Sequence, residues 1–336
     1  MRTFLTAVLF ALLSTPLHAA GTLRIYFIDT EGGQSTLFVS PSGQTMLVDT
    51  GNRDPKGRDP GRIVAVARKA GAMRIDYLVI THYHSDHVGG LPELARLIPI
   101  VNFVDHGPEI EKDAKGEILV NDYVAVREKG HHIVAKPGDR IPIAGLDVRV
   151  LTAAGQAISS PLSGAGSPNP VCASTKLREA DPSENAQSLG TLITFGKFRI
   201  IDLGDLTWNK EMALACPNNK VGTVDVYLST HHGLAVSNCP AIVDALRPRV
   251  AIVNNGETKG GAPEALRTIR NSPGIEDVWQ LHYSRNATKD ENTSADFIVN
   301  VDRDLPVSWI ELDAREDGGF SVTNSRNGKT KTYPAR

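Results

Sequence analysis

One stretch decides the fold of this chain: residues 81–90, THYHSDHVGG, in which three histidines and an aspartate lie within six positions. The apolar run before it, DYLVI at residues 76–80, is too short for a helix and predicts a buried strand. The cluster is therefore expected in the loop at the carboxyl end of that strand. With only 10 histidines in 336 residues, so dense a grouping indicates a functional site rather than an ordinary polar loop.

The residue types of this cluster are those that bind a zinc-like metal ion. Neutral imidazole and carboxylate are usual ligands of zinc in catalytic sites. Alternate residues of an extended loop point the same way, so His82 and His84 can reach one ion. Asp86 and His87 would then face a second ion. A structural zinc site would be closed by four ligands and would commonly include cysteine, which the cluster lacks.

The elements before the cluster have an order that the chain later repeats. They are strands near residues 23–28, 35–39 and 46–48, a helix at 60–70 and the strand at 76–80. The third strand ends at Asp49. A strand, an acidic turn, a helix and a further strand thus lead to His82.

The second half shows the same order. A hairpin at residues 192–201 ends in the acidic turn DLGD, a helix follows at 208–215, and the strand at 225–229 leads to Thr230-His231. Such an internal duplication predicts that both strand ends reach one edge of a two-sheet sandwich. Because Thr230-His231 corresponds to Thr81-His82, we favour His231 over His232 as a metal ligand.

The pattern His-x-His-x-Asp-His after an apolar strand resembles the signature of the metallo-β-lactamase-fold hydrolases. The resemblance extends from about Ile25 to Val301. It implies an α/β fold, a four-layer αββα sandwich built from two similar halves, with the metals at one edge. It also implies hydrolysis by a metal-activated water.

The resemblance implies a ligand set as well. The matching ligands are His82, His84, Asp86, His87, Asp205 and His231. Asp205 corresponds to the carboxylate that bridges two ions, and Asp49 to an acidic residue that supports the metal loop from behind. Asp86 would carry the proton during catalysis. We expect one or two zinc ions, with manganese as an alternative.

The chain departs from the family pattern at one ligand. Most members have a further histidine for the first ion between the central motif and the bridging aspartate, whereas residues 183–190 read SENAQSLG here. Asn185 lies in this region and is a poorer ligand. The first ion could therefore be held weakly, or with a water as its remaining ligand. His232, next to His231, is a further possible site residue.

Within the superfamily the chain most resembles the hydrolase domain of ComEC-type competence proteins, which are implicated in degrading one DNA strand during uptake. The shared features are DTEGGQ at residues 29–34, Asn185 in place of the histidine, Gly204-Asp205 and the run 231–233, HHG. The chain lacks that group's histidine before Pro263 and its membrane spans. These two departures weaken a nuclease assignment, and it is the shared features that lead us to favour a phosphodiester substrate. The alternatives are opening of a lactam or lactone, and a metal-binding or ligand-binding protein without turnover.

The first 20 residues resemble a secretory signal peptide, with Arg2, an apolar run at 4–13 and small residues at the end. The run is too short to span a bilayer, so we expect a secreted or periplasmic protein without a membrane span. The net charge of −2 gives no strong nucleic-acid footprint. The expected partner is a small-molecule or phosphodiester substrate, and the oligomeric state is left open.

We expect residues 21–303 to form the hydrolase domain and residues 304–336 a C-terminal β extension. Residues 153–188 are rich in Ser, Gly, Ala and Pro and have no apolar period, so they predict an irregular insertion. This insertion is interpreted either as a wall of the substrate site or as a disordered surface loop.

The three cysteines are an odd number for an oxidising compartment. Cys172 and Cys216 both lie in loop-like sequence, so we favour a disulfide between them. Cys239 would then be free and close to the metal edge, where a role for its thiol stays open.

Overall fold

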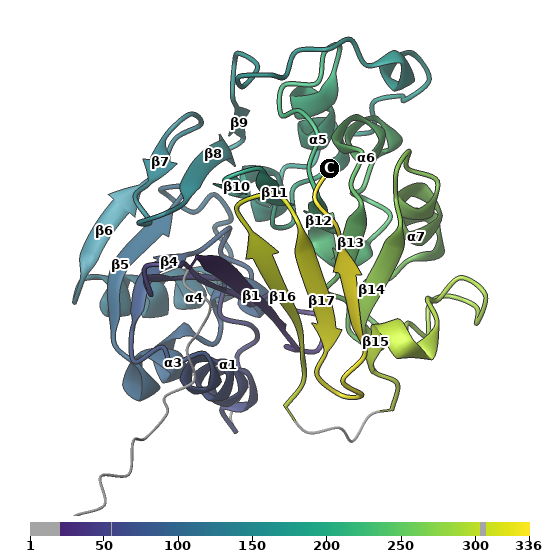
Figure 1. Ribbon diagram of the computed structural model, residues 1–336. Helices are drawn as coiled ribbons and strands as arrows, with labels where there is room; N and C mark the ends of the chain where they lie inside the picture. The colour runs from purple at the N-terminus through teal and green to yellow at the C-terminus, as the bar shows by residue number, and fades with distance from the viewer. Residues whose placement is uncertain (1–20, 55, 303–306) are drawn as a thin grey trace, which may run out of the picture.

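The computed structural model describes residues 21–54, 56–302 and 307–336. The expected signal peptide and the boundary between domain and extension lie outside these residues. The described chain forms two β-sheets packed face to face, with helices on the outer face of each (Figure 1). This four-layer αββα sandwich confirms the predicted fold class.

The first sheet has the strand order β18-β17-β16-β1-β2-β3-β4-β5-β6. Its strands are β1 (Thr22–Ile28), β2 (Thr36–Val39), β3 (Thr45–Val48), β4 (Ile75–Val79), β5 (Ile100–Asp105), β6 (His131–Val134), β16 (Trp309–Arg315), β17 (Phe320–Asn324) and β18 (Thr330–Tyr333). β1 is antiparallel to β2 and β16, whereas β3 to β6 run parallel. The C-terminal strands are therefore part of this sheet.

The second sheet has the order β15-β14-β13-β12-β11-β10-β8-β7, with β9 paired to β8. Its strands are β7 (Arg140–Ile141), β8 (Asp147–Ala153), β9 (Gln156–Ala157), β10 (Gly190–Phe195), β11 (Phe198–Asp202), β12 (Val226–Leu228), β13 (Val250–Val253), β14 (Asp277–His282) and β15 (Ile298–Asn300). β11 to β15 run parallel. Their carboxyl ends form one edge, where long loops leave the sheet.

Helices cover both sheets from outside (Figure 1). They are α1 (Arg58–Lys69), α3 (Leu91–Leu97) and α4 (Ala114–Arg127) on the first sheet, and α5 (Trp208–Ala215), α6 (Pro240–Leu246) and α7 (Pro263–Arg270) on the second. The short helices are α2 (Ser85–Val88), η1 (Pro170–Ala173), η2 (Glu184–Gln187), η3 (Thr230–Gly233) and η4 (Ala295–Phe297). Among the described residues no helix has the length and hydropathy to cross a membrane.

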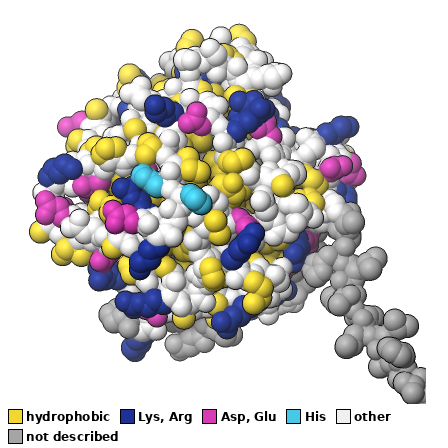
Figure 2. All heavy atoms as spheres, turned by 90° about the vertical axis from the view of Figure 1, so that its left-hand side faces the viewer, with side chains coloured by type: hydrophobic (Ala, Val, Ile, Leu, Met, Phe, Trp, Pro, Cys, Tyr) yellow, Lys and Arg dark blue, Asp and Glu magenta, His cyan; other side chains and the backbone are white. Residues whose placement is uncertain are grey.

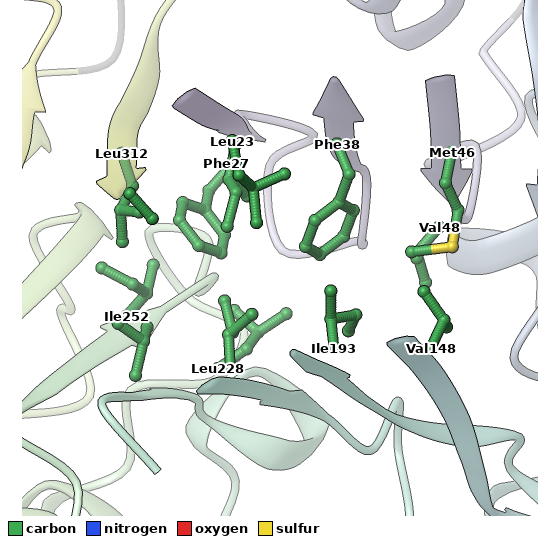
Figure 3. Close-up of a cluster of buried hydrophobic side chains, with 14 of the residues drawn as sticks. Leu23, Phe27, Phe38, Met46, Val48, Val148, Ile193, Leu228, Ile252 and Leu312 are labelled. Atoms are coloured by element: carbon green, nitrogen blue, oxygen red, sulfur yellow. The ribbon is translucent and has the colours of Figure 1, made fainter. Parts of the chain in front are cut away.

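The main core lies between the two sheets. Phe27 and Phe38 of the first sheet face Leu228 and Ile193 of the second (Figure 3). Neighbouring residues of β1 alternate, so Tyr26 packs against the outer helices. Burial on both faces explains why the central strands read as nearly continuous apolar runs.

The insertion at residues 153–188 packs onto the helical layer of the second sheet. A disulfide joins Cys172 to Cys216 at the end of α5, as the positions of the cysteines favoured, and Cys239 is free and buried. Trp208 Nε1 donates to the carbonyl of Lys176 at 3.0 Å. These contacts hold the middle of the insertion against α5.

The surface around β6 carries charges of both signs. Figure 2 shows basic and acidic side chains interspersed with hydrophobic ones on this face, rather than gathered into an area of one sign. All four residues of β6 are exposed. This mixed face agrees with the small net charge of the chain.

Candidate metal centre

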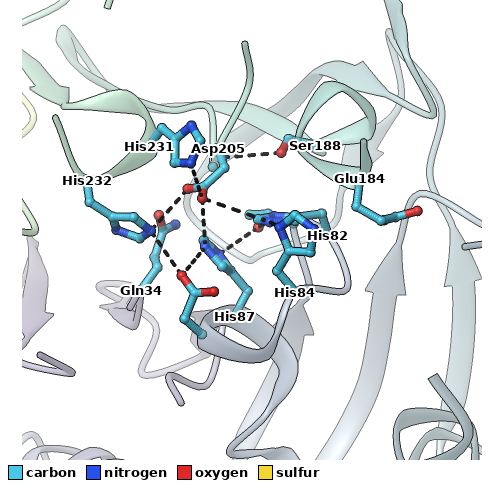
Figure 4. Close-up of polar contacts among 12 residues, drawn as sticks. Gln34, His82, His84, His87, Glu184, Ser188, Asp205, His231 and His232 are labelled. Atoms are coloured by element: carbon cyan, nitrogen blue, oxygen red, sulfur yellow. Dashed lines mark hydrogen bonds and ion pairs between the residues drawn. The ribbon is translucent and has the colours of Figure 1, made fainter. Parts of the chain in front are cut away.

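Loops from the two sheets meet to form the site (Figure 4). The loop after β4 carries His82, and the turn after β11 carries Asp205. Gly204 lets the two loops touch, because its φ is +55° and a Cβ there would lie 2.8 Å from the Cβ of Thr81. The two similar halves thus bring their strand ends to one edge of the sandwich, as the repeated order of elements suggests.

Asp86, His87, Asp205 and His232 form what we call the four-residue group, whose ligand atoms all lie within 4.8 Å of one another. His87 Nε2 is 3.2 Å from Asp86 Oδ2 and 3.2 Å from Asp205 Oδ2. His232 Nε2 is 3.2 Å from Asp86 Oδ2 and 3.3 Å from Asp205 Oδ1. Two imidazoles and two carboxylates therefore face one point.

Three further histidines surround this group. His82 Nε2 lies 3.1 Å from His84 Nδ1 and 4.0 Å from Asp205 Oδ2. His231 Nε2 lies 3.2 Å from the same Asp205 oxygen. Asp205 is therefore between two sets of imidazoles, the place that a bridging carboxylate would take (Figure 4).

The residues present fit a metal ion. Among the described residues, the buried atoms His87 Nε2, His232 Nε2 and Asp205 Oδ1 have no hydrogen-bond partner. An unpaired buried polar atom costs about 1–3 kcal/mol, and metal ligation is the arrangement that uses these lone pairs. Imidazole and carboxylate donors suit zinc, manganese and iron alike.

Asp49 supports the metal loop from behind. Its Oδ1 accepts a hydrogen bond from the Thr81 backbone N–H at 2.8 Å, and its Oδ2 accepts from Thr81 Oγ1 at 2.7 Å. Asp49 Oδ2 also lies 2.7 Å from His87 Nδ1. A proton on Nδ1 satisfies this contact and leaves the Nε2 lone pair directed into the four-residue group.

Glu111 is a supporting residue that the sequence did not reveal. Both of its carboxylate oxygens lie 3.3 Å from His84 Nε2, so His84 presents Nδ1 toward His82. Glu111 Oε1 also accepts the backbone N–H of Glu184 at 3.0 Å. Glu111 lies in a polar loop after β5 that contains no motif, so no local signal distinguishes it.

Lys259 is the second residue that the sequence did not reveal. Its ammonium contacts Asp86 Oδ2, while the side chain is 40% exposed. The loop after β13 that carries it packs closely on the first sheet, since a Cβ at Gly256 would lie 2.7 Å from the carbonyl oxygen of Glu31. The only available signal was a single lysine in the glycine-rich run 256–261, GETKGG.

The charges of the site shift its pKa values. Burial favours the neutral acid of Asp205, but the nearby imidazoles, led by His232, hold its pKa well below the usual value. Burial disfavours the charged form of His87, but the carboxylates around it raise its pKa well above the usual value. Burial lowers the pKa of His231 to about 4, which leaves this imidazole neutral at pH 7, the form that binds metals.

His231 and His232 both have a left-handed backbone, with φ of 55° at each residue. This conformation costs about 1–2 kcal/mol per residue. Hydrogen bonds hold it, from the His231 N–H to the Gly204 carbonyl at 2.9 Å and from the Gly261 N–H to the His232 carbonyl at 2.8 Å. The sequence favoured His231, whereas the structure places His232 in the four-residue group and His231 against Asp205 Oδ2.

Asn185 lies in η2, beside the metal loop. The neighbouring Glu184 carboxylate accepts the Tyr83 backbone N–H at 3.4 Å. The Asn185 side-chain oxygen is buried and has no hydrogen-bond partner in the described part of the chain. It therefore makes no hydrogen bond to the histidines of the site.

Residues 29–161 match the family model described as Metallo-beta-lactamase superfamily. This stretch of the chain is thus similar to that superfamily, and the sandwich fold and the group of histidines and aspartates agree with a metal-dependent hydrolase. The match covers the central motif but ends before Asp205 and His231.

Curated relatives are similar over short stretches. An atrochrysone carboxyl ACP thioesterase from Aspergillus terreus is 31% identical over 67 residues, 20% of each chain. A hydroxyacylglutathione hydrolase from Aliivibrio salmonicida is 46% identical over 55 residues, 16% of this chain and 21% of that protein. The matches thus span about a fifth of these relatives.

Solved structures align over more of the chain. A putative metal-dependent hydrolase from Parabacteroides distasonis has 18% identity and a TM-score of 0.41, covering 77% of this chain and 92% of that one. CmlA, a diiron beta-hydroxylase from Streptomyces venezuelae, has 17% identity and a TM-score of 0.40, covering 69% and 44%.

Proposed function

We propose that this protein is a metal-dependent hydrolase that cleaves a phosphodiester. The observation that carries the proposal is the four-residue group, whose unpaired imidazole nitrogens face the oxygens of Asp205 and Asp86. Bound metal ions would supply an activated water and stabilise charge on the oxygens of the group under attack. The resemblance of the sequence to ComEC-type hydrolase domains supports the choice of a phosphodiester.

Lys259 gives the site a positive charge for an anionic substrate. Its ammonium lies at Asp86 Oδ2 and its side chain is partly exposed, so a substrate phosphate can approach it. A lysine ammonium binds phosphate oxygens by charge-assisted hydrogen bonds. This charge favours a phosphodiester over a neutral ester or lactone.

Asp86 is the group best placed to move a proton. Its side chain is 15% exposed, whereas that of Asp205 is 2% exposed. A carboxylate at the open side of the site can accept a proton from water and release it to a leaving group. The contacts of His84 with Glu111 and of His87 with Asp49 hold the loop that carries Asp86.

A thioester is the second candidate substrate. Two relatives carry the names of a thioesterase and a hydroxyacylglutathione hydrolase. Addition of water to a thioester carbonyl needs the same activated water and charge stabilisation. Opening of a lactam or lactone stays the third alternative, since it follows the same chemistry on a cyclic amide or ester.

The test compares initial rates on bis(p-nitrophenyl) phosphate, an acyl-glutathione thioester and a chromogenic lactam, each with zinc or manganese. His82→Ala should abolish turnover, whereas His131→Ala on the exposed strand β6 should not. If the thioester is hydrolysed faster than the phosphodiester, the proposed substrate would be a thioester instead. A folded protein that binds no metal would refute the hydrolase and leave a binding protein.

We also propose that the protein is exported. The composition of residues 1–20 supports this location, and so does the Cys172–Cys216 disulfide, because such bonds persist in oxidising compartments. Fractionation of cells that express the full chain should place it outside the cytoplasm. A chain lacking residues 1–20 is the matched control and should stay in the cytoplasm. If both forms were found in the same compartments in equal proportion, export would be refuted.

A further inference from the structure

The first of the two metal positions is short of a donor in the family pattern. His82 Nε2 and His84 Nδ1 lie 3.1 Å apart, and Asp205 Oδ2 lies 4.0 Å from His82 Nε2. In the described part of the chain, the Asn185 side-chain oxygen makes no hydrogen bond to these atoms. The four-residue group, by contrast, already provides four donors to the second position.

His231 lies against Asp205 Oδ2, the oxygen that is also nearest to His82. The Ser237 hydroxyl donates to the carbonyl of Leu206 at 2.8 Å, so its oxygen can accept a hydrogen bond from His231 Nδ1 at 3.3 Å. With the proton on Nδ1, the bare Nε2 faces Asp205 Oδ2 at 3.2 Å. Two lone pairs held at this distance repel each other unless a cation lies near both.

The imidazoles of the adjacent residues His231 and His232 lie against different oxygens of the Asp205 carboxylate. His231 Nε2 faces Asp205 Oδ2, which lies between His82 and His87, whereas His232 Nε2 faces Asp205 Oδ1 at 3.3 Å. In an extended strand, successive side chains would point to opposite faces. The left-handed backbone of both residues instead turns both rings toward Asp205.

We propose that His231 is a ligand of the first ion and supplies the donor that the family pattern takes from the region of Asn185. The first ion then has His82, His84, His231 and Asp205, and His232 serves the second ion. This inference rests on the proposed metal-dependent function. It assigns the two adjacent histidines to different ions.

Metal content tests the assignment without relying on activity. Zinc bound per chain would be counted by mass spectrometry after dialysis and titrated by calorimetry, with circular dichroism as the check of folding. We expect two ions in the wild type and one each in His231→Asn and His232→Asn. Asparagine is chosen because it tolerates positive φ and is too short to replace the imidazole. His131→Asn should keep both ions.

Double variants identify the ion that each histidine serves. His231→Asn combined with His82→Asn should still bind one ion, because both changes affect the first position. His231→Asn combined with His232→Asn should bind none. If the asparagine variant misfolds, His231→Gly replaces it, since glycine carries no penalty at this backbone conformation.

The outcomes separate this inference from the proposed function. Two ions of unchanged affinity in His231→Asn would overturn the inference, and so would a single ion in the wild type or no ion in the double variant with His82→Asn. A wild-type protein that binds no ion would instead overturn the metal-dependent function itself.

Discussion

Replacing Asp49 by asparagine tests how the metal loop is held. The Asp49 carboxylate accepts two hydrogen bonds from Thr81 and lies 2.7 Å from His87 Nδ1. Asparagine can keep the two contacts to Thr81, with its oxygen on the backbone N–H and its amide group on the hydroxyl. The same amide group then also faces His87 Nδ1, so two donors meet.

His87 can relieve this clash only by moving its proton to Nε2. That proton would point into the four-residue group, where a metal ion needs the lone pair. A hydrogen bond to a charged group contributes about 1.5–3 kcal/mol. At about 1.4 kcal/mol per tenfold change, Asp49→Asn should weaken metal binding by about 10- to 100-fold.

Competition with a chelator of known zinc affinity would measure this change. Asp105→Asn is the matched control, because Asp105 is also a buried carboxylate 2.7 Å from an imidazole, that of His132, outside the metal-binding residues. The control should lower thermal stability and leave metal affinity unchanged. Unaltered affinity in Asp49→Asn, or an equal loss in Asp105→Asn, would refute the reasoning about the His87 tautomer.

Three further predictions concern substrate charge, pH and packing. Lys259→Ala should raise KM for a phosphodiester by about tenfold and leave hydrolysis of a neutral ester unchanged. Lys197→Ala is the control and should change neither. Equal effects of Lys259→Ala on both substrates would contradict a role of Lys259 in binding the phosphate. Burial raises the pKa of Glu211 to about 7, above that of an unfolded glutamate, so the free energy of unfolding should fall by about 3 kcal/mol as pH rises from 4.5 to 7. Urea titrations at several pH values should show a smaller fall in the free energy of unfolding for Glu211→Gln than for the wild type. An equal fall in both proteins would contradict this role of Glu211. Ile193→Ala, at the centre of the core between the sheets, should lower the free energy of unfolding by about 2–5 kcal/mol, and a loss below 1 kcal/mol would mean that the core repacks.

The elements that carry the site could be predicted because their signals are local. The helix expected at residues 208–215 is α5, Trp208–Ala215, and the helix expected at 60–70 is α1, Arg58–Lys69. Apolar spacing, a proline in the first turn and a glycine after the last turn are all readable along the chain. The central motif is similarly compact, since its ligands lie within six positions.

The environment of the two adjacent histidines could not be read in this way. The correspondence between the two halves of the chain favoured His231 as the metal ligand. The direction of each imidazole ring, however, depends on the positive φ angles of His231 and His232. Gly204 and Gly261, which are distant in sequence, stabilise those angles by hydrogen bonds. Glu111 and Lys259 were missed for the same reason, because tertiary contacts determine the course of the loops that carry them.

The position of β16 beside β1 has a consequence for how the chain is made. Ile25 of β1 pairs with Leu312 of β16, so β1 is synthesised long before the strand that covers this edge. Until then one edge of β1 is open, and an open strand edge invites pairing with other chains. Pairing over so long a separation is also slow. The C-terminal strands therefore protect the newly made chain from aggregation, and a truncation before Trp309 should be recognised first by its loss of soluble yield.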